Sequence, residues 1–289
     1  MTDAGDGPVG IIAGGRDLPF EVADALRMSG RPYFLFGVSG EADQRIELHP
    51  HIWLKWGEVG QLFNTIERQG IRDVLFIGAI TSRPDYKTTR LDFGAVKALP
   101  EILRIVASGG DEGVLQGVAQ FFERRGLRLT SVAEVAPSLV VGNDLRLGDA
   151  KAQTCELDIA LAARAANAIG AIDAGQGVVV AAGRILAMEG PEGTDQMLER
   201  VCRIREDKRA RWAFGKEGVL LKRARPGQDL RFDMPTIGPV TIEYAKRAGL
   251  AGIVCSEGEV LCASRSRCLE LARDVGLFLQ SRNLNDTSL

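Results

Sequence analysis

Apolar and polar residues follow one another along the first half of the chain in a pattern that predicts short buried strands joined by helices. Short apolar runs alternate with longer segments whose apolar residues recur every three or four positions, as in amphipathic helices. The predicted strands are Val9 to Ala13, Pro32 to Val38 and Val74 to Ile80, and the predicted helices are Phe20 to Met28, Glu58 to Gln69, Phe93 to Ala107 and Glu112 to Arg125. Because this alternation requires crossover connections, it predicts a parallel sheet.

The second half of the chain shows a mixed pattern. Gly177 to Met188 and Gly252 to Ala263 each read as strand, glycine-containing turn and strand, which predicts two β-hairpins. The other predicted elements are a strand at Gly218 to Arg223 and helices at Ala150 to Ala168, Thr194 to Ile204 and Ser266 to Arg282. Since a helix follows each hairpin, a repeated hairpin-plus-helix unit is a hypothesis. Arg225 to Gly238 is polar and broken by prolines, so we expect an irregular and functional segment there.

The length of 289 residues suits two domains. We place the boundary in the Val- and Leu-rich segment Ala136 to Leu147, which has Gly and Asn breaks, and assign residues 1–135 and 136–289 to the two domains. The expected fold class is α/β, with a parallel-sheet N-terminal domain and a C-terminal α/β (α+β) domain built on a mixed sheet.

Charge and residue usage exclude several classes of protein. The net charge of −2 gives no basic excess for binding nucleic acid. The sequence contains no run of about 18 apolar residues and no basic-then-apolar leader at Met1 to Gly10, so we expect a cytoplasmic protein. Five cysteines without a CxxC pair predict reduced, mostly buried thiols. With only His49 and His51, histidine-rich metal centres are excluded, and a structural role is favoured for both histidines.

Gly14 and Gly15 lie where the first predicted strand meets the first predicted helix. Backbone N–H groups at such a turn can bind an anionic oxygen, with the helix dipole assisting, but a plain tight turn explains the glycines equally well. The sequence there, GGRDLP, lacks the GxGxxG spacing of dinucleotide-binding proteins, and the second predicted strand ends without an acidic residue. The sequence therefore gives little support to an NAD-binding site.

Carboxylates in glycine- or proline-marked segments form a second group of candidates. Its members are Asp111, Glu112, Asp195, Asp229 and Asp233. Helix capping is the default explanation for Asp111 and for Thr194 or Asp195, which lie at predicted helix starts. If the segment near Asp229 is extended, Asp229, Arg231 and Asp233 lie on one side of it. Oxygen-rich side chains with few histidines favour Mg²⁺, which would neutralise a phosphate group and orient an attacking water.

Four segments resemble the UDP-2,3-diacylglucosamine pyrophosphatases of the LpxI family. They are Gly10 to Pro19 (GIIAGGRDLP), Gly109 to Leu115 (GGDEGVL), Glu189 to Asp195 (EGPEGTD) and Pro226 to Gly238 (PGQDLRFDMPTIG). The resemblance implies a Rossmann-like N-terminal domain, a family-specific catalytic C-terminal domain and a ligand cleft between them. It also implies magnesium-dependent hydrolysis of UDP-2,3-diacylglucosamine to UMP and 2,3-diacylglucosamine 1-phosphate (lipid X) in lipid A biosynthesis.

The resemblance also implies roles for particular residues. Asp229 is the first candidate for catalysis and metal binding, Gln228 and Asp195 are further catalytic candidates, and Asp111 and Glu112 are further metal ligands. The candidates for substrate binding are Gly14, Gly15, Thr194 and Asp233.

The two acyl chains of the implied substrate predict transient contact with the inner-membrane surface. Arg83, Lys87 and Arg90, next to Phe93, are candidates for a basic rim, although an ordinary solvated loop is the favoured interpretation. A homodimer is one further expectation. Two alternatives stay open: a nucleotide-cofactor-dependent oxidoreductase, and a noncatalytic protein that binds a nucleotide sugar or a lipid.

Overall fold

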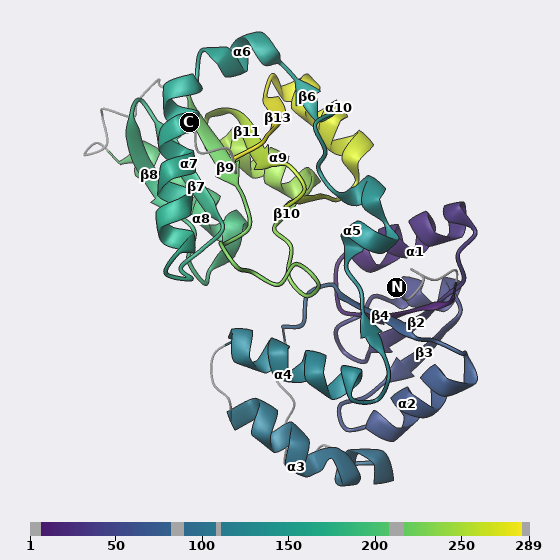
Figure 1. Cartoon of the computed structure of the whole chain (residues 1–289). Coiled ribbons are helices and arrows are strands. Elements are labelled where there is room, and N and C mark those ends of the chain that lie inside the picture. The colour runs from purple at the N-terminus through teal and green to yellow at the C-terminus, as the bar shows by residue number, and fades with distance from the viewer. Residues whose placement is uncertain (1–6, 82–89, 108–110, 208–216, 285–289) are drawn as a thin grey trace. The chain divides into compact units, whose positions relative to one another are not determined.

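The structure, a computed structural model, describes residues 7–81, 90–107, 111–207 and 217–284. For residues 111 and 112 it describes the backbone alone. The chain forms two compact units, and the boundary between them in the sequence falls between Pro137 and Ser138. Each unit has its own sheet (Figure 1). Among the described residues, no helix is both long and apolar enough to cross a membrane.

The first unit is built on a five-stranded sheet. Its elements are β1 (Val9–Ala13), α1 (Leu18–Ser29), β2 (Tyr33–Val38), η1 (Gln44–Leu48), β3 (His51–Leu54), α2 (Val59–Arg68), β4 (Asp73–Ile77), α3 (Phe93–Ala107), α4 (Asp111–Glu123), β5 (Arg128–Leu129) and α5 (Val132–Val135), followed by η2 (Pro137–Leu139) at the boundary. The strand order is β3-β2-β1-β4-β5 and every pairing is parallel. This order is typical of Rossmann-like sheets, so the expected fold class of the first domain is confirmed.

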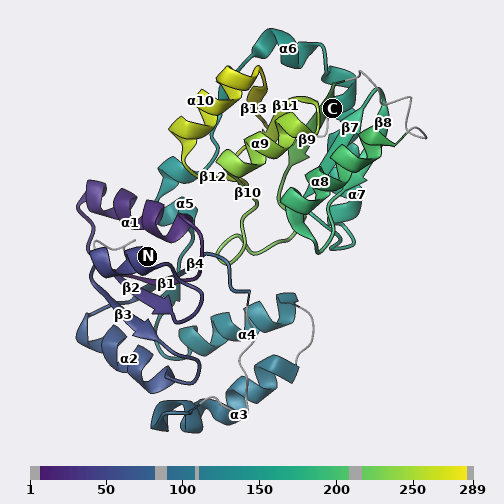
Figure 2. The ribbon, with the colours of Figure 1, turned by 180° about the vertical axis from the view of Figure 1, so that it is seen from behind.

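Crossover helices cover both faces of this sheet, because the connections change direction after β3. Figures 1 and 2 show α1 and α2 on opposite sides of the strands. The central strand β1 is buried along its whole length, as expected for a parallel strand covered on two faces.

The two histidines are part of the packing beside this sheet. The His49 ring stacks on Phe20, and its Nδ1 lies 2.9 Å from the Tyr33 hydroxyl. His51 Nδ1 lies 2.8 Å from the His49 carbonyl oxygen. Burial lowers the pKa of His49. These contacts account for both imidazoles as structural groups.

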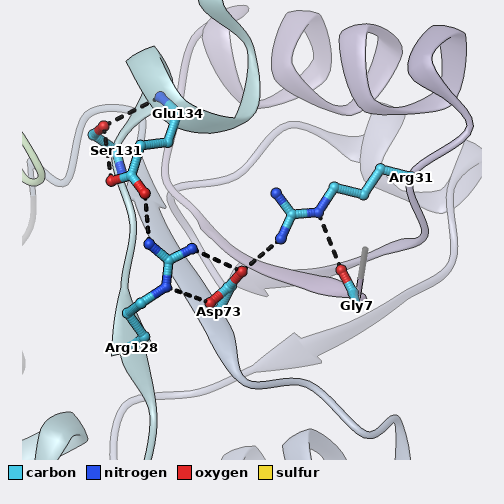
Figure 3. Close-up of polar contacts among 6 residues, drawn as sticks. All are labelled: Gly7, Arg31, Asp73, Arg128, Ser131 and Glu134. Atoms are coloured by element: carbon cyan, nitrogen blue, oxygen red, sulfur yellow. Dashed lines mark hydrogen bonds and ion pairs between the residues drawn. The ribbon is translucent and has the colours of Figure 1, made fainter. Parts of the chain in front are cut away.

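A network of charged side chains joins the amino ends of β4 and β5 (Figure 3). The Asp73 carboxylate accepts hydrogen bonds from Arg31 Nη2 at 2.5 Å and from Arg128 Nε at 2.8 Å and Nη2 at 3.0 Å. Arg128 also donates to Glu134 at 2.5 Å, and Glu134 forms a capping box with Ser131 at the start of α5. Because ligands of such folds bind beyond the carboxyl ends of the strands, a structural role is favoured for this network.

We expect Asp73→Asn to lower the free energy of unfolding by about 2 kcal/mol at neutral pH, because it weakens charge-assisted bonds to two arginines. Burial raises the pKa of Asp73, but the bonds from Arg128 and Arg31 outweigh burial and hold it below the ordinary value. The contribution is therefore complete above about pH 4, the ordinary pKa of aspartate, and is lost as the pH falls through the lower folded-state pKa. Urea unfolding of both proteins at several pH values measures this. Equal stability at neutral pH would contradict the prediction.

The second unit is built on a six-stranded mixed sheet. Its elements are β6 (Arg146–Leu147), α6 (Asp149–Gln153), α7 (Glu156–Gly170), β7 (Gly177–Ala181), β8 (Arg184–Met188), α8 (Gly193–Glu206), β9 (Gly218–Lys222), β10 (Thr236–Ile237), α9 (Pro239–Arg247), β11 (Leu250–Ser256), β12 (Leu261–Cys262), α10 (Arg265–Val275) and β13 (Phe278–Arg282). The strand order is β6-β13-β11-β9-β7-β8, with a small parallel pair of β10 and β12 beside it. Strands β9, β11 and β13 are parallel, whereas β6, β7 and β8 pair in antiparallel fashion. The expected mixed sheet is confirmed.

Side chains alternate between two apolar layers on this sheet. In β9, Val219 and Leu221 pack with α7, whereas Leu220 packs with α8, α9 and α10. Strand β7 divides its valines between the same two layers. This alternation follows from the two-residue repeat of a β-strand and holds helices on both faces.

Three predicted elements of the second unit are wrong. Gly252 to Ala263 is not a hairpin, because β11 lies between β9 and β13 in a parallel ladder and β12 pairs with β10. The helix predicted from Ser266 to Arg282 ends at Val275, where Gly276 adopts φ 72°, and Phe278–Arg282 forms β13. The helix predicted from Ala150 to Ala168 is divided into α6 and α7 at Thr154 and Cys155. Of the two predicted hairpins, only that of β7 and β8 is confirmed, so the proposed repeat is also wrong.

The five cysteines are free thiols, three of them buried. Burial raises the pKa of the Cys155, Cys202 and Cys255 thiols. These cysteines are therefore protonated and poorly reactive at neutral pH.

Candidate active site

Polar side chains gather at one edge of the sheet in the second unit. Strands β9 and β11 end there, at Lys222 and Ser256, because they run in the same direction. The antiparallel strand β7 begins at this edge, with Gly177 opposite Lys222, and β8 ends there at Met188. In open α/β sheets, ligands bind beyond the carboxyl ends of the parallel strands. This edge is therefore the candidate active site.

A buried ion pair lies at the centre of the edge. Lys222 Nζ donates to Glu189 Oε2 and to Thr194 Oγ1, each at 2.8 Å, and the Thr194 hydroxyl donates to Glu189 Oε1 at 3.0 Å. The side chains of Lys222 and Glu189 are only 3% and 9% exposed. A Cβ atom on Gly177 would collide with the Glu189 carboxylate, so glycine at this position makes room for the pair. Three polar side chains, from β9, from α8 and from the residue that follows β8, are thus fixed in one arrangement.

The segment after β9 folds back over the same edge and places Asp233 among hydrogen-bond donors. Asp233 Oδ2 accepts from Gln176 Nε2 at 3.0 Å and from Gln228 Nε2 at 2.6 Å. The Arg225 guanidinium lies 3.6 Å from the same oxygen, and the Arg225 backbone N–H donates to Gln228 Oε1 at 2.9 Å. The predicted candidates Gln228 and Asp233 are therefore in direct contact.

Asp229 is held by its neighbour Arg231. Its carboxylate accepts from the Arg231 backbone N–H at 3.0 Å and from the guanidinium Nη2 at 2.7 Å. These hydrogen bonds outweigh burial and lower the pKa of Asp229, so the carboxylate is ionised at neutral pH. The extended reading of this segment is wrong, because the backbone N–H groups of Phe232 and Asp233 both point to the Asp229 carbonyl oxygen in a turn.

Other predicted site residues lie at helix starts. Asp195 is partly buried in the first turn of α8, which favours a negative charge. Thr194 does not cap α8: its hydroxyl bonds to Glu189 and Lys222, and the N-cap residue is Glu192, without a side-chain cap bond. Asp111 begins α4, but the side chains of Asp111 and Glu112 lie outside the described residues.

Gly14 and Gly15 belong to the first unit, where they follow β1. Their backbone N–H groups donate to the carbonyl oxygens of Ile77 at 2.9 Å and Ala79 at 2.8 Å. A Cβ atom on Gly14 would lie 2.8 Å from the Gly78 carbonyl carbon, so the close approach of two backbones explains this glycine. A ligand contact of these glycines stays a prediction.

The carboxylates offer single ligands for a metal ion. Over the described ranges of the chain, no three His, Cys, Asp or Glu side chains lie close enough to hold a metal together. Mg²⁺ is commonly held by one or two carboxylates together with substrate phosphates. The described side chains therefore form no preformed cage for a metal ion, and Asp229 offers one carboxylate ligand.

Several residues at this edge were not predicted from the sequence as site residues. They are Gln176, Glu189, Lys222 and Arg225. The best signal was Lys222, a charged residue that ends an otherwise apolar strand. The run from Lys222 to Arg231 also contains four basic residues, and each of them lies beside a carboxylate. The edge is rich in cations yet balanced in charge.

The protein consists of a Rossmann-like unit and a mixed-sheet unit, and the second unit carries a charged site beyond its parallel strands. This is the architecture of a two-domain α/β ligand-binding enzyme. Residues 8–139 match the LpxI N-terminal domain and residues 146–280 match the LpxI C-terminal domain. The chain belongs to the LpxI family, which confirms the resemblance seen in the four segments.

One relative is similar to this chain almost from end to end. It is the UDP-2,3-diacylglucosamine pyrophosphatase LpxI of Caulobacter vibrioides, which is 38% identical over 273 residues. The similarity covers 94% of this chain and 96% of the relative.

Proposed function

We propose that this protein hydrolyses the pyrophosphate bond of UDP-2,3-diacylglucosamine to UMP and lipid X in lipid A biosynthesis. The observation that carries the proposal is its end-to-end similarity to a relative named for this activity. The protein is thus an enzyme, a UDP-2,3-diacylglucosamine pyrophosphatase of the LpxI family. In the reaction, the oxygen of water forms a bond to one phosphorus, the bridging P–O bond breaks, and the water loses a proton.

The charge balance of the edge suits a diphosphate. Arg225 and Arg231 are partly exposed, and carboxylates pair with both guanidinium groups. An arriving diphosphate would compete for these groups, since arginine binds phosphate oxygens in bidentate fashion. Asp233 and Thr194 would position the substrate. The buried Lys222–Glu189 pair would act by holding Thr194 in place.

Asp229 is proposed to act through its negative charge. A carboxylate with a lowered pKa is a weak base but a suitable ligand for a hard cation. Asp229 would therefore bind Mg²⁺, and bound magnesium would neutralise the diphosphate and lower the pKa of water. Gln228 would orient the water, and the Asp195 carboxylate would receive its proton.

Removal of divalent cations is expected to abolish turnover. With EDTA, the release of UMP should fall by about 100-fold or more, because the negative charge that develops on the diphosphate in the transition state loses the cation that would stabilise it. Addition of Mg²⁺ should restore the activity. Full activity in EDTA would show that the arginines alone stabilise the transition state.

The location of the enzyme follows from its proposed substrate. A diacylated sugar nucleotide is held by a bilayer, so the enzyme would work in the cytoplasm at the surface of the inner membrane.

A mass-balanced assay tests the activity. Purified protein, UDP-2,3-diacylglucosamine and Mg²⁺ should yield equal amounts of UMP and lipid X by chromatography and mass spectrometry. Release of UDP in place of UMP, or no release at all, would overturn the proposed reaction.

A further inference from the structure

Helix α3 is fixed to the first unit at two places. The Asp92 carboxylate, just before α3, accepts from the Gly60 and Gln61 backbone N–H groups at the start of α2, each at 3.0 Å, and from the Ala95 N–H in α3 at 2.7 Å. Further along α3, Glu101 pairs with Arg124 and Arg125, which follow α4. Figures 1 and 2 both show α3 at the edge of its unit with α4 beside it. The orientation of the helix is therefore determined by these contacts.

The outer face of α3 is apolar. Phe93, Val96, Pro100 and Leu103 are separated by three or four residues and so share one helical face. Phe93 is 87% exposed, and Val96 and Leu103 are more than half exposed. Val106 and Leu91 add exposed apolar area at either end. A continuous row of exposed apolar side chains marks an interaction surface, because isolated exposed apolar residues are common but contiguous patches are not.

Basic side chains border this row. Arg90, Lys97 and Arg104 are all exposed, and the helical repeat places Lys97 and Arg104 beside Phe93 and Pro100. The acidic groups of the same segment are engaged elsewhere: Glu101 contacts two arginines, and backbone N–H groups surround Asp92. The exposed face of α3 is therefore apolar and cationic.

We propose that this face binds the surface of an anionic phospholipid bilayer. The proposal rests on the proposed function, because a diacylated substrate lies in such a bilayer. Phe93, Val96 and Leu103 enter the boundary between headgroups and acyl chains, while Lys97 and Arg104 contact lipid phosphates, with the helix parallel to the membrane plane. No residue of the candidate active site belongs to this face.

Charge favours a lipid surface over a second copy of the chain. A symmetric contact between two α3 helices would bring the same face together twice. Lys97 and Arg104 would then lie close to their own copies, with Glu101 already engaged by Arg124 and Arg125. An anionic lipid surface offers the opposite charge to the same cations.

Vesicle flotation with the full chain tests the proposal. The wild type should float with vesicles of phosphatidylethanolamine and phosphatidylglycerol, and less with neutral phosphatidylcholine vesicles. Phe93→Ser combined with Leu103→Ser should weaken binding by about tenfold or more, because two apolar side chains no longer enter the lipid. Met28→Ser combined with Leu48→Ser is the matched control, since these residues are 87% and 82% exposed in the same unit but outside α3.

Each outcome distinguishes this proposal from the proposed function. Turnover of substrate dispersed in detergent should be equal in the α3 variant, the control and the wild type, whereas turnover of substrate in vesicles should fall only in the α3 variant. Equal flotation of all three proteins would overturn the α3 proposal, even if UMP release stood. Flotation that depends on α3, without UMP release, would support it and overturn the proposed activity. A change from dimer to monomer in the α3 variant would identify the face as a contact between copies and would also overturn it.

Discussion

Replacing Asp229 with asparagine is expected to lower kcat for UMP release by about 10²- to 10⁴-fold. Asparagine keeps the shape of the side chain and can still accept a hydrogen bond from Arg231, but it removes the negative charge that would bind Mg²⁺. The loss should appear mainly in kcat, because the guanidinium groups that bind the diphosphate are unchanged. Steady-state kinetics with saturating Mg²⁺ measures it.

Two matched variants control this experiment. Asp274→Asn makes the same change on the exposed surface of α10 and should leave kcat unchanged. Asp233→Asn should mainly raise KM, since Asp233 contacts Gln176, Gln228 and Arg225 and is proposed to position the substrate. A kcat of Asp229→Asn within about threefold of the wild-type value, with an unchanged unfolding temperature, would contradict the proposed catalytic role of Asp229.

Replacing Lys222 with methionine is expected to produce the largest loss of stability. The Glu189 carboxylate would stay buried without its cation, and breaking such a pair on one side costs about 3–5 kcal/mol. For a unit of this size, the midpoint of thermal unfolding should fall by about 10 °C. Calorimetry of the full chain measures the change.

The double variant separates the buried charge from the packing. Lys222→Met combined with Glu189→Leu removes both charges and should recover most of the lost stability, because two apolar side chains can replace a buried ion pair. UMP release should stay low in this variant, since Thr194 loses both of its partners. A double variant as unstable as Lys222→Met alone would show that Lys222 stabilises the unit through other contacts.

Local patterns predicted the first unit well and the second unit only in part. From Val9 to Ile77, strands alternate with helices, and each strand or helix can be predicted from the apolar pattern of its own segment. Gly252–Ala263 resembles the true hairpin Gly177–Met188, yet β11 pairs with β9 and β13, which lie on either side of it in the sequence. Strand pairing of this kind depends on tertiary packing, which an apolar run around a glycine does not encode.

The candidate site shows the same limit. The sequence identified the segment around Gln228 and Asp229, because prolines and polar residues interrupt the regular pattern there. It did not identify Gln176, whose amide reaches Asp233 across 57 positions of the chain, or Glu189 as the partner of Lys222. Likewise, the helical repeat predicted α3, but only the structure showed that Phe93 and Leu103 point outward.

Hydrogen exchange of the Asp229→Asn variant with UDP-2,3-diacylglucosamine and Mg²⁺ tests most directly whether the substrate binds at the carboxyl edge of the second sheet. Mass spectrometry would compare the amide exchange of every peptide with and without the substrate. Slower exchange at residues 189–195 and 223–238 is the expected result. Unchanged exchange in both segments, with protection only elsewhere in the chain, would contradict the assignment of the site.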